Sequence, residues 1–289
     1  MVANGRICSS HQMLAWNEMR SRAVARPWQG CPARAAVPAP YVSVGSVRTG
    51  MQAGVRRAPR EDEAGAVEVW YGAEQVPRSL SAPGGVGTVV TMGVFDGVHR
   101  GHQAVLGRVV ELSRDLAGDG ERPLAVAVTF DPHPRSVHQP EVDLPLIASL
   151  TDRLASLRDL GLDAVLVITY TLDFASQSPQ EFVRTWLEEL LGVRAVVVGD
   201  DVRFGRYNSG DAASLEQIGR ADGFVVEIVP KIRSDEGRRW SSTWIRQCLK
   251  DGNMGRASQV LGRPHRLRGI VVRGLGRGRE LGFPTANLE

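Results

Sequence analysis

The sequence is poor in cysteine and has no long apolar run. Its three cysteines, Cys8, Cys31 and Cys248, share no short spacing, which argues against a zinc knuckle or a redox pair. Unpaired thiols fit the reducing cytosol. No apolar stretch approaches the roughly 20 residues that a membrane-spanning helix needs, and the N-terminus lacks the pattern of a secretory signal. We therefore expect a cytoplasmic protein without a membrane partner.

Two common nucleotide-binding signatures are also missing. The chain contains no Gly-x-x-x-x-Gly-Lys-Ser/Thr, which excludes a Walker-type P-loop. No Gly-x-Gly-x-x-Gly follows the first strand expected from the apolar pattern, at 88–95, so an NAD-dependent dehydrogenase is only a weak alternative.

Acidic residues are scarce at the start of the chain, where Glu18 is the only acid before Glu61. Residues 1–80 carry 10 arginines against 6 acidic residues, so the chain's net charge of +3 comes from this part and residues 81–289 are close to neutral. Nucleic-acid-binding proteins usually have a basic folded surface. We therefore expect no nucleic-acid partner.

Residues 1–66 show no sustained apolar period, and such a stretch cannot bury enough apolar surface to offset the entropy lost on ordering. Three explanations are open, in decreasing order of preference: a start codon placed too far upstream, with Met51 as one internal candidate, a natural disordered extension, or an Arg-rich transit peptide. We therefore treat residues 1–80 as an extension or a mis-assigned start.

From residue 88 onward, predicted strands alternate with predicted helices. The strands are expected at 88–95, 124–130, 164–170, 194–199 and 224–229, and the helices at 101–117, 150–160, 179–191, 212–221 and 241–249. This alternation predicts βαβ units and an α/β fold with a parallel sheet. Ligands of such sheets bind at the carboxyl ends of the strands. A further strand is expected at 265–273.

The first motif, residues 92–102, joins the first strand to the first helix and reads Met-Gly-Val-Phe-Asp-Gly-Val-His-Arg-Gly-His. Gly97 and Gly101 allow a tight turn and close approach of the backbone to a ligand, and a helix N-terminus favours phosphate. His99 and His102 are spaced so that both imidazoles can face one phosphoryl oxygen. The alternative is that they only cap the helix or pair with Asp96.

The second motif, residues 239–246, reads Arg-Trp-Ser-Ser-Thr-Trp-Ile-Arg at a predicted helix start. Ser242 and Thr243 can donate hydroxyl protons to phosphate oxygens, although serine or threonine here can also be a simple cap. Arg246, one turn along, could pair with a β- or γ-phosphate, with Arg239 just outside. The two motifs together would form the two halves of a triphosphate clamp.

These residues resemble the bacterial FAD synthetases of the H-x-G-H nucleotidylyltransferase superfamily. The first motif resembles the family signature, and three further segments resemble later family motifs in the same order: 129–134 (Thr-Phe-Asp-Pro-His-Pro), 198–205 and 241–246. Residues 269–288 resemble the opening of the riboflavin kinase module that usually follows. The resemblance covers about 85–289 and supports the explanation of a misplaced start.

The resemblance implies a fold, an activity and roles for individual residues. It implies a Rossmann-like FMN adenylyltransferase domain at 81–250, a linker helix at 251–264 and a truncated start of a riboflavin kinase β-barrel at 265–289. His99 and His102 would stabilise the transition state at the ATP α-phosphate. The residues implied to hold ATP and the leaving pyrophosphate are Gly93, Phe95, Asp96, Gly97, Gly101, Arg239, Ser242, Thr243 and Arg246; those implied on the FMN side are Asp131, Pro132, His133, Asp201 and Arg203.

The implied reaction joins FMN and ATP to give FAD and pyrophosphate, with Mg²⁺ held through phosphate oxygens and by no all-protein site. Two departures matter: the family often has Asn-Phe where this chain has Asp201-Val202, and the kinase's catalytic carboxylate would lie beyond Glu289. Thr285 and Asn287 match the kinase's Mg-ATP motif, yet the chain as given is not expected to phosphorylate riboflavin, unlike a full-length parent.

Two further alternatives stay open. A related H-x-G-H enzyme could use another phosphorylated acceptor, such as phosphopantetheine, nicotinate mononucleotide or glycerol phosphate. The chain could also be a flavin-binding or nucleotide-binding module with little or no catalysis.

Overall fold

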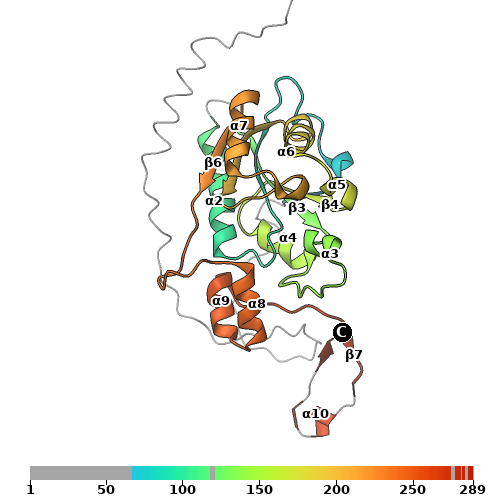
Figure 1. Ribbon diagram of the computed structural model, residues 1–289. Coiled ribbons are helices and arrows are strands. Elements are labelled where there is room, and N and C mark those ends of the chain that lie inside the picture. The colour runs from blue at the N-terminus through green and yellow to red at the C-terminus, as the bar shows by residue number, and fades with distance from the viewer. Residues whose placement is uncertain (1–66, 118–120, 275–276, 281, 284–285, 289) are drawn as a thin grey trace, which may run out of the picture. The chain divides into compact units, whose positions relative to one another are not determined.

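A six-stranded sheet, parallel throughout, forms the centre of the protein in a computed structural model that describes residues 67–117, 121–274, 277–280, 282–283 and 286–288 (Figure 1). The strand order is β1-β4-β3-β2-β5-β6. The strands are β1 (Glu68–Tyr71), β2 (Thr88–Met92), β3 (Leu124–Asp131), β4 (Ala164–Thr169), β5 (Val193–Gly199) and β6 (Val225–Val229). The order reverses direction at β2, and ligands of open α/β sheets bind at such a point.

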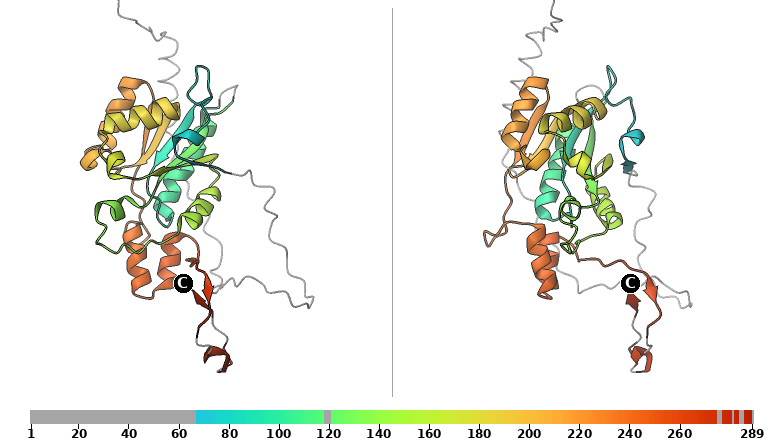
Figure 2. Two further views of the ribbon diagram at one scale, coloured as in Figure 1. Left: turned by 90° about the vertical axis from the view of Figure 1, so that its right-hand side faces the viewer. Right: turned by 45° about the vertical axis from the view of Figure 1, so that its right-hand side comes forward.

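Helices cover both faces of the sheet, which explains why the strands read as continuous apolar runs (Figure 2). Alternate residues of β2 point to opposite faces: Val89 packs with α2 (Arg100–Asp115) and α4 (Leu150–Arg158), whereas Val90 packs with the other layer. That layer consists of α6 (Pro179–Phe182), the π-helix η2 (Val183–Leu190) and α7 (Ala212–Asp222).

The expected α/β fold is confirmed, and each predicted helix and strand up to residue 250 is present with shifted ends. The tail differs. The strand expected at 265–273 is reduced to β7 (Val271–Val272), which pairs antiparallel with β8 (Asn287–Leu288). Two-residue strands do not make a barrel, so the start of a kinase barrel stays a prediction. The short helix α10 (Arg277–Glu280) lies between them in sequence.

The folded domain includes residues before 81, so the predicted boundary there is wrong. β1 pairs with β4 at the edge of the sheet. The short helix η1 (Ala73–Gln75) follows, and Trp70, Val76 and Leu80 are buried in the core. Residues 67–80 are therefore part of the domain rather than an extension, because their apolar side chains complete one face of the sheet.

Two C-terminal helices form a separate core. α8 (Ser242–Lys250) and α9 (Met254–Leu261) pack against each other around Ile245 and Val260, beneath the stacked rings of Trp240 and Trp244. α9 falls in the segment predicted as a linker helix, and its buried residues Ala257, Val260 and Leu261 pack in the same cluster as Ile245 of α8. Within the described ranges, no helix is both long and apolar enough to cross a bilayer.

Candidate active site

The turn between β2 and α2 is built around the buried carboxylate of Asp96. This carboxylate accepts hydrogen bonds from the backbone N–H of Ile147 (3.0 and 3.1 Å) and Ala148 (3.1 Å). It also pairs with Nη2 of Arg246 at 2.5 Å, while the Asp96 carbonyl accepts the Ser242 hydroxyl at 2.9 Å. Asp96 therefore joins the first motif to the second, and it does not pair with the histidines as one alternative held.

The backbone of this turn is strained. Phe95, Gly97 and Val98 have φ angles of 53°, 83° and 42°. Glycine is required at 97, because a Cβ there would lie 2.8 Å from Cγ2 of Ile147. Left-handed backbone costs a non-glycine residue of order 1–3 kcal/mol and persists only where the surroundings enforce it. The side chains around the turn must therefore hold it in place.

The two histidines stack on each other at the start of α2, with ring centroids 3.6 Å apart. Nδ1 of His99 accepts the backbone N–H of His102 at 3.2 Å, so the capping interpretation is correct for His99. Capping leaves Nε2 of His99 available as the N–H donor of the neutral ring. Gly101 keeps this arrangement open, since a Cβ there would lie 3.1 Å from the His99 ring.

Both histidines are neutral at pH 7. Burial, followed by the charge of Arg239, lowers the pKa of His99 to about 4. Burial also lowers the pKa of His102 well below its ordinary value, with His99 and Arg239 adding to the effect. Two neutral imidazoles can donate hydrogen bonds to an anion without themselves titrating near pH 7.

A cavity of about 210 Å³ lies at the carboxyl ends of β2, β5 and β6, and His99 and His102 line it. Its lining also includes Gly93, Phe95 and Gly101 from the first motif. Arg239 and Asp201 form an ion pair at this cavity, and the neighbouring Asp200 pairs with Lys231 at 3.3 Å. Asp201, expected on the FMN side, thus lies beside the histidines, and Arg203 donates to the Val202 carbonyl at 2.9 Å.

The second motif is docked on the first. Ser241, rather than Ser242, caps α8 through its hydroxyl, which accepts the Trp244 N–H at 3.2 Å. Arg246 donates its Nε–H to the Pro145 carbonyl at 2.9 Å in addition to its bond with Asp96. Of the residues expected to clamp phosphate, Arg239 lines the cavity, whereas Ser242, the exposed Thr243 and Arg246 lie outside its lining.

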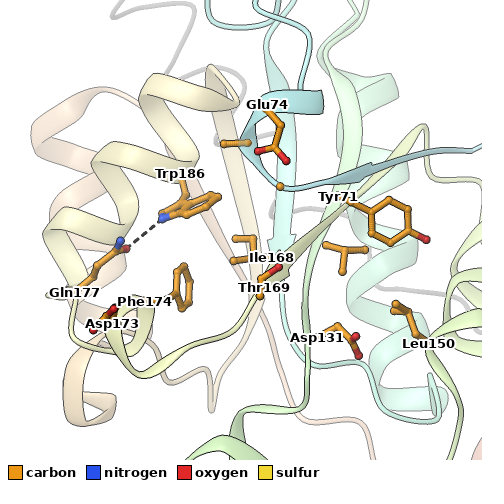
Figure 3. A pocket seen from close by; sticks show the side chains of 13 residues that line it. Tyr71, Glu74, Asp131, Leu150, Ile168, Thr169, Asp173, Phe174, Gln177 and Trp186 are labelled. Atoms are coloured by element: carbon orange, nitrogen blue, oxygen red, sulfur yellow. Dashed lines mark hydrogen bonds between the residues drawn. The ribbon is translucent and has the colours of Figure 1, made fainter.

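A second and larger cavity, of about 600 Å³, lies at the carboxyl ends of β1 and β4 beside the end of β3 (Figure 3). Aromatic rings of Tyr71, Phe174 and Trp186 line it, and Trp186 donates to Gln177 at 3.1 Å. Asp131 is the one residue predicted on the FMN side that lines this cavity. Of the other two predicted residues nearby, Pro132 is exposed, and His133 caps the short helix α3 (Pro134–His138) by accepting the Arg135 N–H at 3.0 Å.

Comparison with protein families identifies the chain. The FAD synthetase family model matches residues 84–244, and the riboflavin kinase model matches residues 261–289. The chain belongs to the FAD synthetase family. The resemblance seen in the sequence motifs is thereby confirmed.

Named relatives of this FAD synthetase family member are bifunctional riboflavin kinase/FMN adenylyltransferases. The Pseudomonas fluorescens protein is 39% identical over 203 residues, covering 70% of this chain and 63% of the relative. The Listeria monocytogenes protein is 37% identical, covering 71% and 63%. The chain thus spans about 63% of the length of these relatives. A solved structure described as a macrolide-efflux protein from Streptococcus pneumoniae matches with a TM-score of 0.64 and 29% identity, covering 77% of this chain and 69% of that one.

Several residues at this edge of the sheet had escaped the sequence analysis. Tyr71 and Glu74 line the larger cavity from a segment assigned to the extension. Arg153 of α4 is buried, and its guanidinium ties the strand ends together by donating to the carbonyls of Val94 and Phe130, each at 3.0 Å. The sequence did contain a signal for Arg153, because it lies on the apolar face of the helix predicted at 150–160. Thr285 of the kinase motif lies outside the described residues, and Asn287 is exposed on β8.

Proposed function

We propose that this chain is an FMN adenylyltransferase, which joins MgATP and FMN to give FAD and pyrophosphate in FAD biosynthesis. The observation that carries the proposal is the stacked, neutral pair His99 and His102 in a cavity at the N-terminus of α2. Membership of the FAD synthetase family supports the choice of reaction.

In this mechanism an FMN phosphate oxygen attacks the α-phosphorus of ATP, and the bond from that phosphorus to the β-phosphate bridging oxygen breaks in line. The histidine N–H groups and the first amides of α2 stabilise the charge that builds on the α-phosphate oxygens. The chain supplies no nucleophile, because FMN already carries one. Catalysis is then positioning and charge stabilisation, with Mg²⁺ entering bound to the phosphates of ATP.

The two cavities suggest where the substrates bind. We assign ATP to the smaller cavity, where Gly93, Phe95 and Gly101 let the nucleotide approach the backbone. The larger, aromatic cavity, which Asp131 also lines, suits the flavin ring. The aromatic lining of this cavity also favours a flavin over the non-aromatic acceptors phosphopantetheine and glycerol phosphate.

The leaving pyrophosphate would meet Arg239 first, since this residue already lines the smaller cavity. Ser242, Thr243 and Arg246 are proposed as further pyrophosphate ligands. For Arg246 this requires that its guanidinium be shared between Asp96 and a phosphate oxygen.

We place the protein in the cytoplasm with small-molecule substrates and without a nucleic-acid or membrane partner. Riboflavin phosphorylation, which the names of the relatives include, would need more than the matched segment 261–289. In a complete kinase module Thr285 and Asn287 would contribute to binding MgATP.

Incubation of the purified chain with MgATP and either FMN or riboflavin, followed by chromatography of the flavins, tests this function. We expect FAD and pyrophosphate from FMN. Tight FMN binding without pyrophosphate release would instead indicate a binding module. Parallel incubations replace FMN by nicotinate mononucleotide or phosphopantetheine, or supply glycerol phosphate with MgCTP. Pyrophosphate released only in one of these would identify a different transferase.

A further inference from the structure

The segment after α9 contacts the back of the strained turn in the first motif. The guanidinium of Arg263 donates from Nη2 to the Gly97 carbonyl at 2.8 Å and from Nη1 to the Val98 carbonyl at 3.1 Å. Arg263 also donates to the Leu261 carbonyl at 3.3 Å. It lies in the segment that matches riboflavin kinase, yet its hydrogen bonds reach the adenylyltransferase motif.

Gln103 of α2 reinforces this contact from the other direction. Its Nε2 donates to the carbonyls of Val98 and Leu261, each at 2.8 Å. The Val98 carbonyl, at a valine with a φ of 42°, therefore accepts from two side chains. A β-branched residue avoids this backbone region unless its surroundings enforce it.

The contact differs from an ordinary surface ion pair. Within the described ranges, Arg263 has no carboxylate within ion-pair distance, and its hydrogen bonds go to main-chain carbonyls. Arg268, five residues later, instead pairs with Asp152 of α4 at 2.9 Å. Arg266 also pairs with Asp152, at 3.5 Å. The segment thus has one arginine on the turn of the first motif and two that anchor it to α4.

We infer that Arg263 is a positioning residue for adenylyl transfer, which holds the turn formed by Phe95–Val98 so that His99 stays directed into the nucleotide cavity. The inference rests on the proposed function. In this role Arg263 makes the transferase activity depend on a side chain from the segment that matches riboflavin kinase. The turn has three residues with left-handed backbone, so we expect it to relax when the hydrogen bonds to its carbonyls are lost. A displacement of about 1 Å at a reacting group can lower the rate about 10²-fold.

The test compares Arg263→Ala, Arg263→Lys and the matched control Arg268→Ala in the full chain. We expect Arg263→Ala to lower kcat for FAD formation by roughly 10- to 100-fold, with the KM for ATP changed less than about threefold. Arg263→Lys should recover part of this loss, because an ammonium group can donate to one of the two carbonyls. Arg268→Ala should keep kcat within about twofold of the parent.

Amide hydrogen exchange gives a second measurement that needs no turnover. Exchange of the amides at 97–103 should be faster in Arg263→Ala and unchanged in Arg268→Ala. If the parent chain makes no FAD, the proposed function fails, and unchanged exchange at 97–103 would overturn the role of Arg263 separately. If the parent is active and the two alanine variants lose kcat equally, Arg263 is only an anchor of the segment and the inference is wrong.

Discussion

The two cavities at the carboxyl edge of the sheet are built in different ways. The histidine cavity is small and lined by a strained turn whose polar groups are held by hydrogen bonds from α8 and from the segment after α9. The aromatic cavity has almost three times that volume, and its lining includes the rings of Phe174 and Trp186, which contact each other edge to face. The first arrangement suits charge stabilisation at fixed distances, and the second suits binding of a flat apolar ring.

His102→Ala should give the largest effect and should affect the first cavity alone. Loss of one donor to the α-phosphate should lower kcat by about 10²–10³ and leave the KM for FMN nearly unchanged. Steady-state kinetics with both substrates varied would measure this. The matched control is His138→Ala on the flavin side, where the exposed imidazole contacts the Tyr170 hydroxyl at 3.0 Å. Near-normal turnover of His102→Ala would count against the proposed mechanism.

The histidine cavity should also make the protein sensitive to acid. The folded-state pKa of His99, about 4, lies below its ordinary value of 6.5, so the unfolded chain binds more protons between these values. Stability from this group is fully present above pH 6.5 and is lost as the pH falls toward 4. The shift corresponds to about 3 kcal/mol in the free energy of unfolding.

Urea unfolding at pH 7.0 and pH 4.5 would measure this loss, with His99→Asn as the comparison. The asparagine oxygen can still cap α2 but does not titrate. We expect a smaller difference between the two pH values in the variant than in the parent. Equal differences would mean that other groups cause the acid sensitivity.

Phe174→Ala should weaken FMN binding in the aromatic cavity and leave the rate of adenylyl transfer nearly unchanged. Phe174 contacts the rings of Tyr170 and Trp186, with centroids 5.4 and 5.5 Å away. Loss of an aromatic contact worth about 1 kcal/mol or more should raise the KM for FMN by roughly fivefold to tenfold, with kcat changed little. Tyr207→Ala, at an exposed ring 93% accessible to solvent, is the control. A fall in kcat without a change in KM would place Phe174 with the reacting groups.

The sequence predicted the histidine cavity better than the aromatic one. The histidine motif is contiguous, so its local pattern already specifies a strand, a turn and a helix start. The lining of the aromatic cavity includes both Tyr71 and Trp186, which are far apart in the sequence, and Tyr71 reaches this edge of the sheet because β1 pairs with β4. A four-residue edge strand after a long stretch without apolar period carries too weak a pattern to be recognised.

Residue spacing also could not show which partner each polar side chain would choose. Ser242 and Arg246 stand where a phosphate clamp was expected, yet both bond to Asp96. A hydroxyl or guanidinium at a helix start can serve a ligand or the protein itself, and only the three-dimensional arrangement decides between them. The role of Arg263 was hidden for the same reason, since its acceptors are backbone carbonyls with no sequence signature.

Asp201→Asn should give the smallest effect, and it tests how charge at the histidine cavity affects ATP binding. Asp201 pairs with Arg239, and both side chains are nearly half exposed, so the pair should contribute little to stability. In the free protein, however, Asp201 competes with a phosphate for the guanidinium. We expect the KM for ATP to fall about twofold to threefold at low salt, with less difference at high salt because the charges are screened. Asp200→Asn, which removes the neighbouring pair with Lys231, is the control. A rise in the KM for ATP in Asp201→Asn alone would mean that this carboxylate assists nucleotide binding. The aspartate that this chain has in place of the family's frequent asparagine would then have a function.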